Sequence, residues 1–342
     1  MRANVMKRCV ISLISKLSFW MGLTHFFYWL NRDRKRVITF HNVLPKDLFK
    51  INLTNGVSDS DESFRRIIRE IKKRFNFSVD LEDSKTVTIT FDDGYLNQYE
   101  IAGRILQEEG NIPAILFVAG DLLDNGTPER ALVVDQLLHW VAYAPCGMYK
   151  LTHLDGTQEN FCLEVKKRGV VWGQIIRPAY VKDVEGRGRG LLKQLDEQYS
   201  IEKIYSQLPA EYKRLRLTGI TSEQVDKLRS HGWKVGWHTK SHFPLSALSE
   251  ADKQEEIMPL IGFKDTVFSY PYGELLSVDN ASIKIVEACG YPCAVSNLLE
   301  RGKLNGLYFL PRMALMTNKY RLHFRLSGLE YFLKYRKRLP LK

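Results

Sequence analysis

The sequence predicts an α/β protein in which parallel strands and crossover helices form a barrel. Two observations predict this class. Strand-like and helix-like segments alternate along the chain, and the side chains suited to chemistry come where strands end. The 342 residues, of which 44% are hydrophobic, suffice for one large domain or two small ones with a buried core.

The first half of the chain supplies the clearest elements. Apolar residues three and four apart predict a helix over 63–75. Alternating threonines and apolar residues predict a strand that leads into a loop at Gly94. A helix over 97–109 and a strand over 114–118 are expected next, so this part reads as helix, strand, helix, strand.

The second half continues the alternation. Residues 233–237 are strand-like. A helix that ends near His231 is expected before them, and Thr221 and Ser222 are suited to cap its N-terminus. A further helix is expected over 280–289, and Gly290 is a typical helix stop. These elements predict that the barrel continues to the last strand-like segment of the chain.

A long insertion, about 121–217, separates these two halves. Residues 132–140 predict an amphipathic helix, and the glycine-rich stretch 185–190 predicts a mobile turn. We expect a helical insertion. It is either a flap beside the cleft, where it would select the substrate, or a helical pair packed on the barrel.

Two adjacent carboxylates follow the strand that ends near residue 91. Neighbouring residues on an extended chain point to opposite sides, so Asp92 and Asp93 need not do the same work. One carboxylate can bind a metal while the other faces water. The alternative is an ordinary tight turn, since Asp-Gly is a common turn pair.

Two histidines follow the strand-like segment 233–237. The spacing of His238 and His242 is expected to put both imidazoles on one face of a helical turn. One carboxylate and two imidazoles hold a zinc-type ion and leave a position open for water, and a second carboxylate can act as the base. This is the equipment for metal-assisted hydrolysis.

Three segments in order resemble the motifs of the polysaccharide deacetylase family (NodB homology, carbohydrate esterase family 4). They are residues 90–95 (Thr-Phe-Asp-Asp-Gly-Tyr), 238–242 (His-Thr-Lys-Ser-His) and 269–273 (Ser-Tyr-Pro-Tyr-Gly). Residues 38–42 further resemble the opening strand of a bacterial surface-polysaccharide subgroup, and the similarity spans about 37–316. The resemblance implies an irregular (β/α)7-type barrel.

The resemblance also implies roles for individual residues. Asp93, His238 and His242 would bind a divalent metal, with Zn²⁺ favoured, and a metal-bound water would be the nucleophile. Asp92 would be the general base, and the backbone N–H of Tyr272 would help to hold the oxyanion.

Two departures from the family pattern concern the base and the acid. Ser269 occupies the place where the family has an arginine that orients the base, and Arg312 on the last predicted strand is expected to reach the same carboxylate. The family's Leu-x-His acid has no clear copy. His323 is a poor substitute, and His41 at the end of the opening strand is the better candidate by position.

Charge gathers at the two ends of the chain. The formal net charge is +11, yet residues 1–40 carry eight Lys or Arg against one Asp, and residues 319–342 carry eight against one Glu. Both ends interleave these bases with aromatic and apolar residues, a pattern that favours contact with an anionic membrane surface. A secretory signal, a single spanning helix over 9–30 and solvated basic ends are the alternatives, and no nucleic-acid motif accompanies the charge.

These observations predict three parts: a basic amphipathic segment 1–36, a barrel 37–318 that includes the insertion, and a basic–aromatic tail 319–342. The five cysteines are odd in number and lack metal spacing. We therefore expect a cytoplasmic protein, peripheral on the inner face of the plasma membrane.

The predicted function is that of a hydrolase. It removes an N-acetyl (N-acyl) group from a sugar of a surface polysaccharide of the cell envelope, or of its lipid-linked precursor. An O-acetyl sugar esterase and a catalytically retired, glycan-binding member of a polysaccharide assembly machine remain as alternatives. The sequence does not specify which sugar is used.

Overall fold

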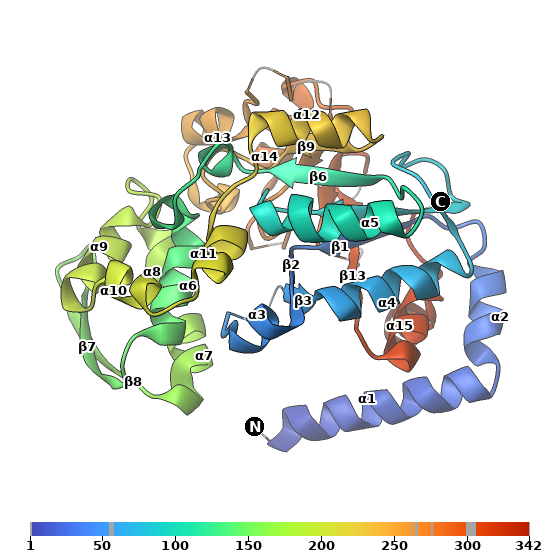
Figure 1. Ribbon diagram of the computed structural model, residues 1–342, viewed down its shortest axis with the longest axis horizontal. Helices are drawn as coiled ribbons and strands as arrows, with labels where there is room; N and C mark the ends of the chain where they lie inside the picture. Colours follow the sequence, from blue (N-terminus) through green and yellow to red (C-terminus); the bar gives the residue numbers. More distant parts are fainter. Residues whose placement is uncertain are drawn as a thin grey trace.

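A parallel sheet rolled into a barrel forms the centre of the molecule, which we describe from a computed structural model (Figure 1). The structure describes residues 2–54, 58–260, 262–263, 266–274, 276–298 and 306–341. The strands follow the order β12-β11-β10-β9-β6-β5-β1-β13, and every neighbouring pair is parallel. Their bounds are β1 (Arg36–Phe40), β5 (Thr86–Phe91), β6 (Ala114–Val118), β9 (Lys234–Trp237), β10 (Phe268–Ser269), β11 (Ala294–Ser296), β12 (Leu310–Pro311) and β13 (Met313–Ala314).

The two ends of this sheet meet at one residue. β12 pairs with β11 and β13 pairs with β1, and only Arg312 stands between β12 and β13. The two short strands are thus halves of one strand that closes the ring, which leaves seven strand positions. The prediction of an irregular seven-strand barrel is confirmed. A further short strand, β4 (Asn76–Phe77), pairs with β5 outside the ring.

Helices cover the outside of the barrel, close to where the sequence predicts them. They are α4 (Asp61–Lys72), the π-helical η1 (Gln98–Gly103) with α5 (Arg104–Glu108), α12 (Ser222–Ser230), α13 (Glu250–Ile257) and α14 (Asn280–Ala288). Thr221 is the N-cap of α12 and forms a capping box with Gln224, as its position before the helix indicates. The predicted helix over 97–109 begins with a π-helical turn, a feature common at functional sites.

The insertion forms a lobe beside the barrel (Figure 1). Its main elements are α6 (Val133–Tyr143), β7 (Gly147–Thr152), β8 (Gln158–Leu163), α7 (Arg168–Val171), α8 (Arg177–Lys182), α9 (Arg189–Gln198), α10 (Ile201–Ser206) and α11 (Ala210–Leu217). The helix predicted over 132–140 is confirmed as α6. The insertion is mainly helical, as expected, and it also contains an antiparallel hairpin of β7 and β8 that was not expected. The ring centroids of Tyr149 on β7 and Trp140 on α6 are 4.8 Å apart. The two-stranded hairpin is thus stabilised by packing against a helix.

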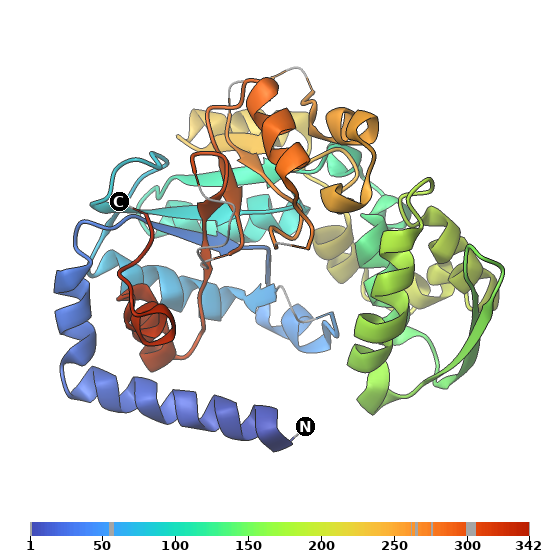
Figure 2. The ribbon, with the colours of Figure 1, turned by 180° about the vertical axis from the view of Figure 1, so that it is seen from behind.

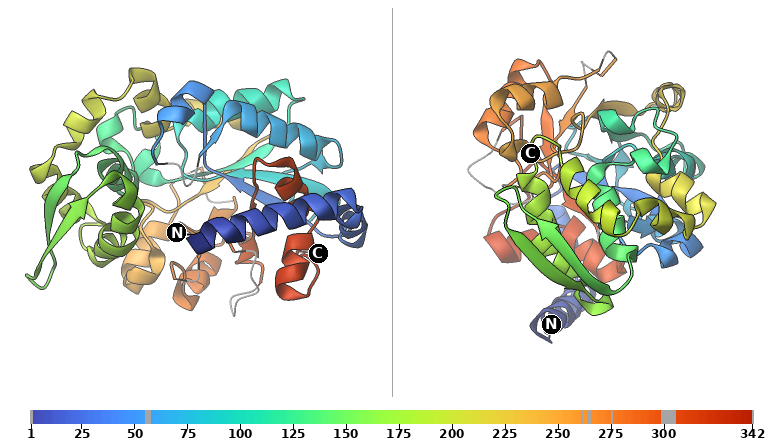
Figure 3. Two further views of the ribbon diagram at one scale, coloured as in Figure 1. Left: turned by 90° about the horizontal axis from the view of Figure 1, so that it is seen from below. Right: turned by 90° about the vertical axis from the view of Figure 1, so that its left-hand side faces the viewer.

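Segments from both ends of the chain lie together on one side of the barrel (Figures 2 and 3). They are α1 (Arg2–Trp20), α2 (Leu23–Leu30), α15 (Lys319–Leu326) and α16 (Leu329–Tyr335). The view from below shows α1 running alongside α15. A small parallel pair, β2 (Asn42–Leu44) with β3 (Ser58–Ser60), and α3 (Lys46–Ile51) lie between this side and the insertion.

Candidate metal centre

The two adjacent carboxylates diverge because the chain turns sharply where β5 ends. Asp92 still follows the sheet, and its N–H donates to the Phe40 carbonyl at 3.2 Å. Asp93 then adopts φ 87° and Gly94 φ 92°, a left-handed conformation that glycine tolerates and aspartate rarely adopts. The two side chains consequently face different partners, as expected, although the cause is this turn and not an extended chain.

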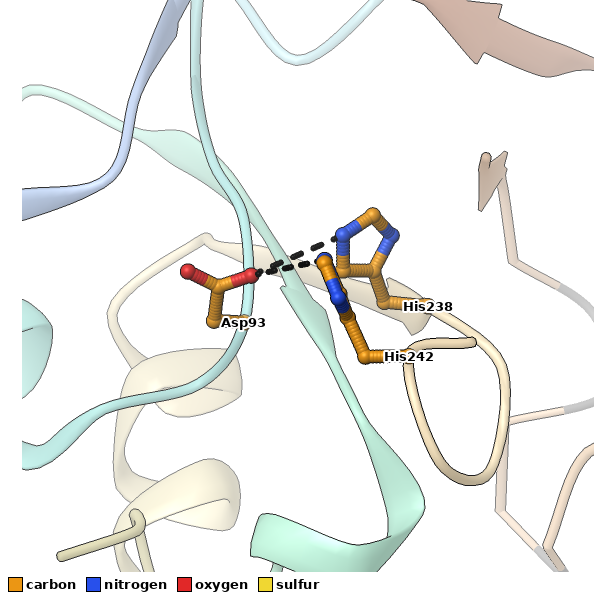
Figure 4. Close-up of side chains that lie close together, drawn as sticks. All are labelled: Asp93, His238 and His242. Carbon is orange, nitrogen blue, oxygen red and sulfur yellow. Dashed lines mark ion pairs between the residues drawn. The ribbon is translucent and has the colours of Figure 1, made fainter. Parts of the chain in front are cut away.

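Asp93 meets the two histidines at the centre of the barrel mouth (Figure 4). One ligand atom from each of Asp93, His238 and His242 lies within 4.8 Å of the other two, and all three residues are buried. The Asp93 Oδ1 atom is 3.7 Å from His238 Nε2 and 3.4 Å from His242 Nε2. Strand ends far apart in the sequence thus bring these three side chains together.

The surroundings of the two imidazoles suit a bound cation. His238 Nδ1 lies 2.7 Å from the Ser269 carbonyl, which only accepts, so Nδ1 carries the proton and Nε2 presents a lone pair to the cluster. His242 Nδ1 is buried and finds no hydrogen-bond partner within the described ranges. A carboxylate with two neutral imidazoles is a donor set that zinc and similar ions accept, so the three residues can hold a metal ion.

Burial shapes the protonation of this cluster. It lowers the pKa of His238 to about 3 and also lowers that of His242, so both imidazoles are neutral at neutral pH. Burial raises the pKa of Asp93 to about 7, and the nearby Asp135 and Asp92 carboxylates add to the rise. Negative charge on Asp93 is therefore costly without a cation beside it.

The segment that carries both histidines is a loop, so the expectation of a helical turn is wrong. Thr239 and His242 have φ of 65° and 60°, which no α-helix contains. The cause is the buried carboxylate of Glu256 on α13, which accepts from Ser241 N at 2.8 Å and from Ser241 Oγ at 2.6 Å. His242 N donates to Thr239 Oγ1 at 3.1 Å, which closes the loop on itself.

Asp92 faces the other way, into a buried ion pair with Arg312. The Arg312 Nη1 and Nη2 atoms each lie 2.7 Å from one oxygen of the carboxylate. The guanidinium also donates to Thr90 Oγ1, to the Ser296 carbonyl and to Ser269 Oγ, at 3.0–3.2 Å. Burial alone would raise the pKa of Asp92, but Arg312 holds it well below its usual range.

His41 and Tyr272 complete the surroundings of the two carboxylates. His41 Nε2 is 3.7 Å from Asp92 Oδ2, and its side chain is 21% exposed, whereas Asp92 is fully buried. The Tyr272 ring centroid lies 4.9 Å from that of His242. His323 lies elsewhere: on α15 it contacts the Tyr28 hydroxyl at 2.9 Å, within the group of terminal helices.

Backbone strain concentrates at this site. Four residues of the three motif segments, Asp93, Thr239, His242 and Tyr272, have φ between 60° and 87°. Positive φ is uncommon for residues other than glycine, and for a β-branched threonine it is an outlier. Such conformations persist where surrounding contacts over-determine them, and they cluster at functional sites.

Two residues that support the site, Gln98 and Glu256, were not predicted from the sequence. Gln98 accepts from Gly94 N at 3.0 Å and donates to the carbonyls of His41, at 2.8 Å, and Asp92. It thereby joins the ends of β1 and β5. Glu256 holds the histidine loop as described above. Neither stands in a recognisable motif, because Gln98 joins the first motif segment to His41 on another strand, and Glu256 reaches Ser241 from a later helix.

A third group ties the insertion to the metal cluster. The Tyr95 hydroxyl, two residues after Asp93, donates to Asp135 on α6. Arg216 on α11 donates to the same carboxylate at 2.5 Å, and Asp135 and Arg216 are both buried. The insertion is therefore anchored beside the first motif rather than at a distance from it.

Similar solved structures include several deacetylases. A Streptococcus pyogenes deacetylase, PplD, is 14% identical over 86% of this chain and 97% of its own, with a TM-score of 0.48. IcaB from Ammonifex degensii has the same identity, coverage and score. A polysaccharide deacetylase from Bacillus cereus is 13% identical over 86% of this chain and 68% of its own, also at 0.48.

No protein-family model and no curated protein sequence matches the chain. The geometry of the Asp93, His238 and His242 cluster is the basis of the function proposed below.

Proposed function

We propose that this protein is a metal-dependent carbohydrate deacetylase that hydrolyses an N-acetyl (N-acyl) group on a sugar. One observation carries the proposal: a buried Asp–His–His cluster lies beside a second carboxylate, Asp92, that is held ionised by Arg312. A three-ligand site with an open position and an adjacent base is what amide hydrolysis at neutral pH requires.

The residues would divide the work as follows. Asp93, His238 and His242 hold the cation, which when bound supplies Lewis-acid chemistry and makes water nucleophilic near neutral pH. Asp92 accepts a proton at its carboxylate, oriented by the two hydrogen bonds from Arg312.

Two further groups would act on the other side of the reaction. The Tyr272 backbone N–H donates to the carbonyl oxygen as negative charge develops on it. His41, next to Asp92 and partly exposed, delivers a proton to the departing amine. Zinc is the cation we propose, because two imidazoles and one carboxylate with an open fourth position make up a known type of catalytic zinc site.

The proposed substrate is an N-acetylated sugar of a surface polysaccharide or of its lipid-linked precursor. The three motif segments support the sugar class through their resemblance to polysaccharide deacetylases. The insertion is placed to contact the substrate, since its Asp135 is hydrogen-bonded to Tyr95 within the first motif segment.

Metal content and acetate release, measured together, test this function. Asp93→Ala, His238→Ala and His242→Ala should each lose both the metal and the release of acetate from N-acetylated sugars. Asp92→Asn should keep the metal and lose about 10²–10⁴-fold in turnover. We expect one equivalent of metal per chain, read by elemental analysis.

The same experiment separates the alternatives. Acetate released only from O-acetyl sugars would identify an esterase. A protein that binds metal and glycans but releases no acetate would be the retired, glycan-binding member. Near-full activity in Asp92→Asn would show that the base is another group.

A further inference from the structure

α1 exposes most of its large apolar side chains and buries two small polar ones. The face toward the body of the protein carries Ser15 and Ser18, which are 0% and 7% exposed, together with the partly buried Ile11 and Phe19. The opposite face carries large apolar side chains at three- and four-residue spacing, each 40–80% exposed: Val10, Leu13, Ile14, Leu17, Trp20 and Met21. In water the serines would be expected outside and the leucines inside.

The same exposed surface continues onto α2. Leu23, Phe26 and Trp29 are 39–58% exposed, while Thr24 and Phe27 between them are buried. We call these three residues, the five on α1 and Met21 just after it the apolar terminal face. Exposed apolar side chains gathered in this way mark contact with a partner or a membrane.

Contacts with the C-terminal helices hold this face in place. The Phe19 ring lies 5.4 Å from that of Tyr320 and 5.2 Å from that of His323, both on α15. The Phe27 ring lies 5.0 Å from that of Phe332 on α16. α1 is therefore fixed on one side of the molecule, alongside α15 (Figure 3). Its larger apolar residues remain exposed there.

Positive charge flanks the apolar terminal face. Lys16 is exposed on α1, and Arg32 is exposed just beyond α2 with its guanidinium 4.8 Å from the Trp29 ring centroid. Arg336 and Lys337, after α16, are also exposed. The sequence contains no acidic residue before Asp33, so nothing within the first 32 residues offsets these bases.

From these observations we infer that the apolar terminal face is a docking surface for an anionic membrane. α1 and α2 lie in the headgroup region, with their leucines and aromatic rings at the boundary of the acyl chains and the bases among the lipid phosphates. A second copy of the chain is a poorer occupant, because face-to-face pairing would bring the two basic ends together.

The helix geometry fits a contact in the plane of the bilayer. Among the described residues, no single helix is long and apolar enough to cross a membrane. The consecutive segments Val10–Trp20 and Leu23–Leu30 pass only as a pair, bent by 79°. Ser15 and Ser18 rest against the protein, which leaves one side of α1 for lipid.

This docking would bring the metal centre to sugars carried on lipids, a consequence that rests on the proposed deacetylase function. The docking itself does not rest on it. Binding to vesicles is therefore measured without substrate, and activity is measured on a soluble N-acetylated sugar without vesicles, so that either idea can fail alone.

Co-sedimentation of the full chain with vesicles tests the inference. Vesicles of phosphatidylcholine are compared with vesicles that contain about one-third phosphatidylglycerol. We expect binding to the anionic vesicles that weakens at high salt. The double variant Leu17→Gln/Trp20→Gln should bind at least about tenfold less well. Leu276→Gln, which alters an 89% exposed leucine outside the face, should bind like the unmodified protein.

Several results would overturn the docking surface. One is binding that is absent, or that is equal in the double variant and the unmodified protein. Another is that the unmodified protein is a dimer, the double variant is a monomer and neither of them binds vesicles, since that would identify a second copy as the occupant. Retention of the protein in membranes after alkaline carbonate extraction would replace in-plane docking by insertion across the bilayer.

Discussion

At the scale of single residues, the most consequential pair is Asp92 with Arg312. A carboxylate buried completely would normally take up a proton, yet both of its oxygens receive a charged donor at 2.7 Å. The guanidinium is in turn satisfied by Thr90, Ser269 and Ser296. Ser269, which stands where the motif of the similar family has an arginine, thus contacts Arg312 instead.

This pairing predicts a change in pH dependence. Arg312→Gln removes the charge that lowers the pKa of Asp92 and leaves burial, which raises it. Asp92 would then be protonated at higher pH, so the acidic limb of the kcat/KM profile should move up by about 1–3 pH units. The measurement is acetate release against pH with the metal-loaded protein.

Arg312→Lys is the matched control for that experiment. It keeps the positive charge and loses the two-pronged hydrogen bond, so the limb should move less while turnover still falls. Equal profiles in the unmodified protein and Arg312→Gln would mean that Arg312 supports the barrel and not the ionisation of Asp92.

At the scale of elements, the histidine loop depends on the helix that follows it. Glu256 on α13 accepts from both the N–H and the hydroxyl of Ser241, and Arg187 from the insertion lies 3.4 Å from the same carboxylate. The two imidazoles are therefore aimed by a residue that contacts neither of them.

Removing that support should weaken metal binding. Glu256→Ala leaves the strained backbone at Thr239 and His242 without its anchor, and we expect a loss of about 10–100-fold in metal affinity with a folded protein. Competition with a coloured chelator measures the affinity. Glu255→Ala is the control, because its carboxylate is exposed and pairs with the Lys240 ammonium, at 2.6 Å, rather than with Ser241. If both variants bind metal equally, the loop holds its shape without Glu256.

At the scale of the whole molecule, a buried ion pair within the insertion is hydrogen-bonded to the barrel. Asp135 and Arg216 come from the first and last major helices of the insertion, α6 and α11, and Tyr95 joins them to the first motif. The lobe and the metal cluster should therefore lose their structure together.

A stability measurement tests this coupling. Asp135→Asn leaves the fully buried Arg216 charge without its counterion, which should cost about 3–5 kcal/mol in the free energy of unfolding. Asp135→Asn/Arg216→Met should recover much of that loss, because no unpaired charge remains. Denaturant unfolding with an unchanged slope gives both values. A single variant as stable as the double variant would show that Arg216 finds another partner.

Local patterns predicted the barrel and the convergence of the motif segments. Strand alternation located the ends at Asp92 and His238, and barrel closure explains why Arg312 on the last strand reaches Asp92. The loop shape at 238–242 could not be predicted, because a carboxylate on a later helix determines it. The β7–β8 hairpin was not predicted, although the turn pair Asp155-Gly156 between its two strands indicates it.

The seam of the barrel has one more consequence. The strand over residues 310–314 both completes the ring and carries Arg312, the counterion of the proposed base. If that short strand separated from its neighbours, the barrel would open and Asp92 would lose its counterion and take up a proton at the same time. Loss of turnover on warming should then precede bulk melting, with residues 310–314 the first part of the ring to exchange its amide hydrogens.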